Sequence, residues 1–132
     1  MNDSLEKLFS MAKSASNKAY SPYSKFCVGA AILTKSNKIF TGCNIENASY
    51  GATVCAERTA IFKAVSEGEK DFLAIAIFVD SDKLFPPCGM CRQVMSEFSD
   101  DLVIIYGNDN KIIESNIKKL LPESFSLNKE DK

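Results

Sequence analysis

Thr53-Val54-Cys55-Ala56-Glu57-Arg58 is the first of two linked motifs in this sequence, and Pro86-Pro87-Cys88-Gly89-Met90-Cys91-Arg92-Gln93 is the second. Cys88 and Cys91 have the spacing that places two thiolates on one zinc ion, and Cys55 can supply a third ligand. A structural zinc site is usually closed by four protein ligands, whereas a catalytic site keeps one position for water. Glu57 follows Cys55 closely enough to act as a base for that water without binding the metal. The two motifs therefore predict a catalytic zinc site with Glu57 as its general acid and base.

Two other interpretations of the cysteines remain open. The cysteines could form a structural zinc site whose fourth ligand is not recognised, or Cys88 and Cys91 could be a redox-active pair. Neither has a use for the carboxylate of Glu57 beside Cys55. The chain contains no histidine, which excludes imidazole ligands and His-based nucleophilic triads. Any proton shuttle must therefore be a carboxylate or a thiol.

The order of these residues is that of the zinc deaminases, in which a ligand-x-Glu precedes Pro-Cys-x-x-Cys and the first ligand is His or Cys. Together with Cys43-Asn44-Ile45-Glu46-Asn47-Ala48-Ser49-Tyr50, it makes the chain resemble the small cytidine deaminases, from Ser21-Pro22-Tyr23-Ser24 through Leu120-Leu121-Pro122 to Phe125. The resemblance implies one Zn²⁺ per subunit. It also implies hydrolytic deamination of cytidine and 2′-deoxycytidine to uridine and 2′-deoxyuridine with release of ammonia, a reaction of pyrimidine salvage.

Length and composition set the broad class. At 132 residues the chain suits one domain over 1–132, and its 45% apolar and 25% charged residues argue against disorder or a fibrous architecture. The net charge is −1 and the Lys and Arg residues are scattered, so a nucleic-acid polymer is a poor candidate substrate. No apolar run approaches the ~20 residues that span a bilayer, and Met1-Asn2-Asp3-Ser4-Leu5-Glu6 lacks the pattern of a secretory leader. We expect a cytoplasmic protein without membrane contact.

Five cysteines are an odd number, and the metal would take three of them. Cys27 and Cys43 are then unpaired or packed in the interior, so a disulfide framework is not expected.

Hydrophobic periodicity predicts alternating helices and strands. Asp3 and Glu6 resemble a capping arrangement for a first helix over 4–19, and Phe72 to Val79 is an unbroken apolar run typical of a central strand. Both cysteine motifs fall at helix N-termini, where the helix dipole favours thiolate. The pattern predicts a three-layer α/β/α domain around about five strands. The other expected elements are strands over 27–34, 39–42, 102–106 and 111–114, and helices from 54 to Gly68, after Pro87, and over 117–121.

Three thiolates and one zinc ion sum to −1, which weakens the metal as a Lewis acid unless a positive group compensates. The resemblance implies that Arg58 donates hydrogen bonds to a ligand sulfur and that Gln93 assists. A solvated helix arginine is the alternative for Arg58.

The resemblance also assigns the substrate contacts. Asn44 and Glu46 would bind the ribose hydroxyls, although a polar surface loop is the plain alternative. Phe26 and Phe125 would sandwich the pyrimidine, whereas core packing is the usual role of such aromatics. Backbone groups of Ala56 would orient the base. Finally, the resemblance implies a homotetramer in which neighbouring subunits supply Tyr50 and Phe125, unless Phe125 packs onto its own domain.

Two alternatives to a cytidine deaminase remain. One is a deaminase of the same fold for another aminopyrimidine compound, such as the blasticidin S deaminases, which also carry Cys-Ala-Glu and Pro-Cys-Gly-x-Cys. Arg58 and the run from Asn44 to Tyr50 favour cytidine. The other is a non-catalytic zinc-binding module, which would need no base beside an open coordination position.

Overall fold

The computed structural model describes residues 2–127, which form a five-stranded sheet in the order β2-β1-β3-β4-β5. The β3–β4 pair is parallel and the other pairs are antiparallel. The strand Phe72–Val79 lies in the middle of the sheet, as its continuous apolar run predicts. The elements in chain order are α1 (Asp3–Ser16), β1 (Val28–Thr34), β2 (Ile39–Cys43), the 3₁₀ turn η1 (Tyr50–Ala52), α2 (Ala56–Ser66), β3 (Phe72–Val79), α3 (Gly89–Phe98), β4 (Val103–Gly107), β5 (Ile112–Asn116) and α4 (Ile117–Leu120).

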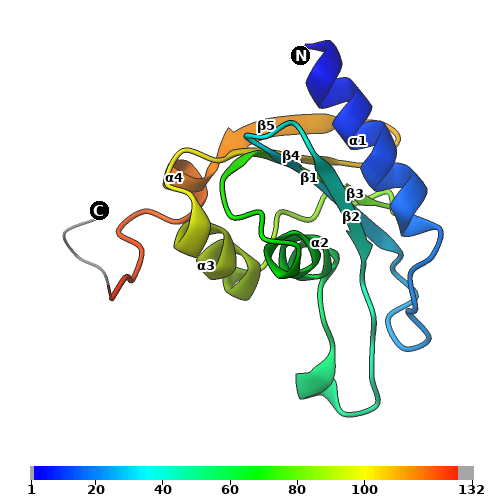
Figure 1. The fold of residues 1–132 in the computed structure, drawn as a ribbon. Helices are drawn as coiled ribbons and strands as arrows, with labels where there is room; N and C mark the ends of the chain where they lie inside the picture. The colour runs from blue at the N-terminus through cyan, green and yellow to red at the C-terminus, as the bar shows by residue number, and fades with distance from the viewer. Residues whose placement is uncertain (1, 128–132) are drawn as a thin grey trace.

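The sheet lies between two helical layers, with α1 on one face and α2 and α3 on the other (Figure 1). Successive side chains of a strand point to opposite faces, so β3 contributes to both cores. Ile75 and Ile77 pack in the cluster with α2 and α3, whereas Ala76 and Phe78 pack in the cluster with α1. The three-layer α/β/α arrangement is therefore confirmed.

The first helix differs from the prediction at both ends. Its N-cap is Asn2, whose Oδ1 accepts a hydrogen bond from Leu5 N at 2.9 Å, and not Asp3. It ends at Ser16, so the predicted range of 4–19 is too long. The chain turns after Ser16 because Tyr20 forms hydrogen bonds with the loop after β2. The backbone N–H of Tyr20 donates to Asn44 O at 3.0 Å, and its carbonyl oxygen accepts from Glu46 N at 2.8 Å.

The remaining elements agree with the prediction to within a few residues at their ends. The β1–β2 hairpin is confirmed, with Ala31 opposite Thr41, and Gly68 ends α2 with a positive φ of 89°. Helix α2 begins one residue after Cys55, which is its N-cap and does not lie inside the first turn. None of the helices in the described part of the chain is long and apolar enough to cross a membrane.

All five cysteines are free.

Candidate metal centre and active site

The N-termini of two helices bring the two cysteine motifs together. Cys55 is the N-cap of α2 and Cys88 is the N-cap of α3, while Cys91 lies in the first turn of α3 and is fully buried. At a helix N-terminus, unpaired backbone N–H groups and the positive end of the helix dipole attract negative charge.

The three sulfur atoms have the separations of ligands that share one metal ion. Cys88 Sγ lies 3.5 Å from Cys91 Sγ and 3.8 Å from Cys55 Sγ, and all three lie within 4.8 Å of one another. Tetrahedral zinc with Zn–S bonds of about 2.3 Å places its sulfurs about 3.8 Å apart. The residues therefore fit zinc. These three form the one such metal-ligand group found among residues 2–127.

Electrostatics at the site favour a thiolate on Cys55. Hydrogen bonding from Cys91 and then from Arg58 lowers the pKa of the Cys55 thiol to about 5. The same bond raises the pKa of Cys91, because that thiol is the donor to the Cys55 thiolate. Arg58 Nη2 donates to Cys55 Sγ at 3.5 Å, which in turn raises the pKa of the guanidinium. The contact between Arg58 and a ligand sulfur that the resemblance implies is thus present.

Glu57 is positioned beside the sulfurs but faces a cavity. It lies in the first turn of α2, its side chain is 5% exposed, and burial raises its pKa to about 7. The negative charge of Cys55 adds to the rise. A buried carboxyl with a pKa near neutrality suits a group that both accepts and returns a proton. The role of Glu57 as general acid and base stays a prediction, and its burial and raised pKa are compatible with it.

A cavity of about 170 Å³ adjoins Glu57. Asn44 and Ala56, which the resemblance assigns to the substrate, line it together with Cys55 and Cys88. Phe85 also forms part of its wall and is not among the predicted site residues. Its position directly before Pro86, in a loop that leads into a metal ligand, is the signal that could have found it.

Asn44 and Glu46 both turn towards the segment 23–28, as alternation along an extended chain predicts. Asn44 is buried; its Oδ1 accepts from Val28 N at 2.9 Å and its Nδ2 donates to Phe26 O at 2.8 Å. One further donor and one further lone pair of this amide remain for a ligand. Asn44 therefore anchors the start of β1 and also reaches the cavity.

Glu46 lines a different cavity, of about 410 Å³, together with Tyr50. Its carboxylate accepts from the backbone N–H groups of Tyr23 and Ser24 at 2.9 and 3.1 Å, and from the hydroxyl of Ser24, which lowers its pKa. Within one subunit the structure thus brings Asn44, but not Glu46, to the cavity beside Glu57.

The aromatic candidates lie at the surface. The Phe26 ring packs edge-to-face on Phe85 at 5.2 Å between centroids, so it adjoins the wall of the Glu57 cavity. Tyr50 is 79% exposed and Phe125 is 63% exposed, so neither packs into the core of its own domain. The Gln93 amide donates to the backbone carbonyl of Phe125 at 3.1 Å. The described contact of Gln93 is therefore with the C-terminal segment, and its influence on the metal charge stays a prediction.

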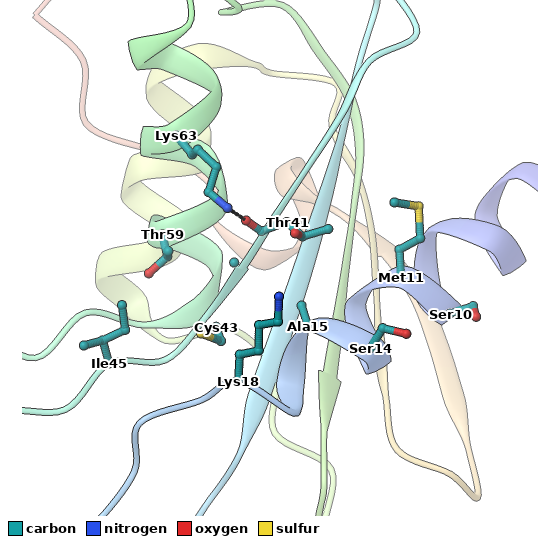
Figure 2. Close-up of a pocket in the computed structure, with 11 residues that line it drawn as sticks. Ser10, Met11, Ser14, Ala15, Lys18, Thr41, Cys43, Ile45, Thr59 and Lys63 are labelled. Carbon is teal, nitrogen blue, oxygen red and sulfur yellow. Dashed lines mark hydrogen bonds between the residues drawn. The ribbon is translucent and has the colours of Figure 1, made fainter.

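A larger cavity of about 620 Å³ lies elsewhere, between α1, β2 and α2 (Figure 2). Lys18 and Lys63 line it, and the Lys63 ammonium group donates to the carbonyl oxygen of Thr41 on the sheet edge. This cavity contains no carboxylate and none of the three clustered cysteines. The predicted catalytic residue Glu57 and the clustered Cys55 and Cys88 line the smaller cavity instead.

A zinc-dependent hydrolytic enzyme is the class of protein that this fold and this site define. The family model described as the cytidine and deoxycytidylate deaminase zinc-binding region matches residues 2–107, and the chain belongs to this family. A cytidine deaminase of Sporosarcina psychrophila is 50% identical over 129 residues, which cover 96% of this chain and 93% of that relative. The crystal structure of cytidine deaminase from Burkholderia pseudomallei matches with a TM-score of 0.87 at 43% identity, covering 95% of this chain and all of that chain (100%). A blasticidin-S deaminase from Bacillus cereus is more distant, with 38% identity over 79% of this chain and 80% of its own length.

Proposed function

We infer that this protein is a zinc-dependent deaminase that hydrolyses cytidine and 2′-deoxycytidine to uridine and 2′-deoxyuridine, with release of ammonia. The observation that carries the inference is the buried Glu57 carboxyl beside three cysteine sulfurs with the separations of zinc ligands. The family and the relatives reported above support this substrate class.

Cys55, Cys88 and Cys91 would hold the zinc ion, which supplies Lewis-acid activation of a water molecule when it is bound. Glu57 accepts one proton of the attacking water and passes it to ring N3 of the pyrimidine. It then takes the second proton from the hydroxyl on C4 and delivers it to the amino group, which leaves as ammonia while the C4 carbonyl forms. One carboxylate serves each transfer, since no other acidic side chain and no lysine lines this cavity among the described residues.

Arg58 sets the charge of the site. Its guanidinium donates to Cys55 Sγ, which offsets the net negative charge of three thiolates around a dication. The Nε atom of Arg58 is buried and has no hydrogen-bond partner within residues 2–127. A buried donor without a partner is costly, and the contact of Nη2 with Cys55 Sγ offsets part of this cost.

We propose that the substrate contacts are shared between subunits of a homotetramer. A cavity of about 170 Å³ is smaller than the ~300 Å³ at which small-molecule sites begin, so one subunit does not enclose a nucleoside. Phe26 and Asn44 supply part of the wall, while Glu46, Tyr50 and Phe125 are presented outward, where a neighbouring copy can reach them. Light scattering gives the assembly mass, and a monomer with full activity would refute shared sites.

The cysteine cluster also gives an indication of the cellular compartment. Three free thiols in one cluster persist in a reducing compartment, so we propose that the protein acts in the cytoplasm. Fractionation with a thiol-trapping reagent tests this proposal.

Zinc content and loss of cytidine absorbance, measured on the same sample, test the proposed function. We expect zinc together with conversion of cytidine to uridine. Zinc without turnover of any pyrimidine would indicate a non-catalytic module. Turnover of blasticidin S at a higher kcat/KM than cytidine would indicate the alternative substrate.

A further inference from the structure

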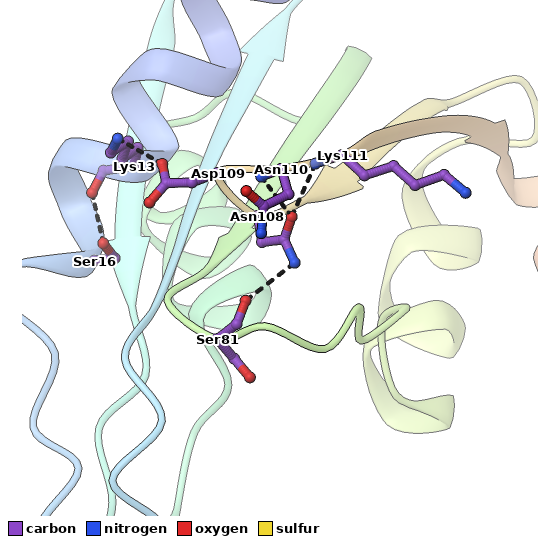
Figure 3. A network of polar contacts seen from close by, with 7 residues as sticks. All are labelled: Lys13, Ser16, Ser81, Asn108, Asp109, Asn110 and Lys111. Carbon is purple, nitrogen blue, oxygen red and sulfur yellow. Dashed lines mark hydrogen bonds and ion pairs between the residues drawn. The ribbon is translucent and has the colours of Figure 1, made fainter.

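A buried asparagine outside the metal centre connects the β4–β5 turn to the loop between β3 and α3 (Figure 3). Asn108 follows β4 directly and is 4% exposed. Its Oδ1 accepts from the backbone N–H groups of Asn110 and Lys111, each at 2.9 Å. Its Nδ2 donates to the carbonyl oxygens of Ser81 at 3.0 Å and Asp82 at 3.3 Å. Both ends of the amide therefore have two partners each, which is the full capacity of this side chain.

The turn that carries Asn108 connects β4 to β5 and is held in one conformation by its own contacts. Asn108 N donates to Lys111 O at 3.0 Å, and a Cβ on Gly107 would lie 2.2 Å from that same carbonyl oxygen, so the turn is closed as tightly as glycine allows. The turn is also tied to α1, because Asp109 pairs with Lys13 at 2.6 Å. The amide of Asn108 is thus held in place independently of the loop that it contacts.

The loop on the other side of these hydrogen bonds leads to the metal centre. Residues 80–88 form no helix or strand and carry both Phe85 and Cys88 into the site. One end is held by Asp80 N, which donates to Cys27 O at 3.0 Å, and the other by Arg92 Nε, which donates to Pro87 O at 2.6 Å. The hydrogen bonds from Asn108 reach Ser81 and Asp82, which lie between these two ends of the loop.

The position of Phe85 depends on this stretch. Phe85 is 39% exposed and its described ring contact is with Phe26, which itself is 42% exposed. The contact between these two exposed rings stabilises one position of the loop only weakly. Displacing the Ser81 and Asp82 carbonyls would leave a buried N–H group of Asn108 without a partner, and that cost restricts the loop to one position.

We propose that Asn108 is a positioning residue for the deaminase reaction: its amide holds the β3–α3 loop so that Phe85 closes the substrate cavity beside Glu57. The proposal rests on the proposed function for its kinetic consequence. Asn108 does not line that cavity and acts through the two loop carbonyls.

Asn108→Asp tests the proposal, because a carboxylate still accepts from the turn N–H groups but has no N–H to donate and faces two carbonyl oxygens. We expect the KM for cytidine to rise about tenfold, the size expected for one lost aromatic contact, while kcat changes less than about threefold because Phe85 takes no part in the chemistry. In the zinc-loaded protein without substrate, amide hydrogen exchange of residues 80–85 should become faster than in the parent.

Two further variants keep the test decisive. Asn108→Ser also accepts from turn N–H groups and is too short to reach the loop, so it replaces the aspartate variant if that one does not fold. Asp109→Ala is the matched control, since it removes the ion pair with Lys13 in the same turn but no bond to the loop. Its KM and its exchange in residues 80–85 should equal those of the parent.

Unchanged exchange in residues 80–85 in the folded Asn108 variants would overturn the proposal. Faster exchange spread equally over α1 and β1 would also overturn it, because that result describes general destabilisation. Faster exchange of the loop with an unchanged KM would show that the loop position does not matter to the substrate. A parent protein that does not deaminate cytidine would refute the proposed function, while the exchange comparison would still decide whether Asn108 holds the loop.

Discussion

Replacing Glu57 by glutamine should abolish nearly all deamination and leave the metal in place. The substitution keeps the shape of the side chain and removes its ability to carry a proton. Glu57 is 5% exposed, and within the described residues its cavity is lined by no other acidic group that could take over the transfers. General acid–base catalysis contributes about 10²–10⁴-fold for one transfer. Because Glu57 is assigned several transfers, kcat should fall by at least about 10⁴-fold, equivalent to about 5.4 kcal/mol of transition-state stabilisation.

The assay is the loss of cytidine absorbance at saturating substrate, with zinc measured on the same sample. Glu57→Ala should behave in the same way, since the residue is not assigned to the metal. Glu97→Gln is the matched control, because it makes the same charge change at an exposed position of α3 and should leave kcat unchanged. A Glu57→Gln protein with kcat within tenfold of the parent would refute the assignment. Loss of zinc from it would show that Glu57 is a ligand.

Three further predictions concern the metal and the ribose. Cys55→Ala, Cys88→Ala and Cys91→Ala should each weaken zinc binding by more than about 100-fold and lower the thermal stability, since both helix ends lose a shared anchor; undiminished zinc in any one of them would rule out that ligand. Arg58→Gln should keep zinc but lower kcat about 10- to 100-fold, because the negative charge of the thiolates is no longer offset; steady-state rates at saturating cytidine check this, and an unchanged kcat would contradict it. Free cytosine should have a far lower kcat/KM than cytidine. Glu46→Ala should reduce this difference in kcat/KM by raising the cytidine KM about tenfold. Equal kcat/KM for both substrates in the parent would exclude ribose contacts.

Local pattern and spacing are enough to predict the framework of this protein. Strand β3 has its predicted bounds because an unbroken apolar run of 8 residues has the length and composition of a strand covered on both faces. The cysteine cluster follows from spacing, because a cysteine at the start of a helix and another in its first turn face the same point.

The features that were missed depend on contacts between distant segments. The end of α1 at Ser16 is set by the hydrogen bonds of Tyr20 with the loop after β2, and the propensities of residues 17–19 do not reveal them. Asn2 and Asp3 are both good N-cap residues, so the sequence does not distinguish them. Phe85 has no periodic pattern around it, and its place in the cavity wall follows from Phe26 and from the bonds that Asn108 makes with the loop.

The most direct test of the central claim is a zinc titration of the metal-free, reduced protein, followed by the rate of cytidine conversion to uridine. Three cysteine ligands around one ion predict that activity is absent without zinc, rises in proportion to added zinc and reaches its plateau at one equivalent per chain. Deamination by the metal-free protein, or zinc binding at one equivalent without any deamination, would contradict the claim.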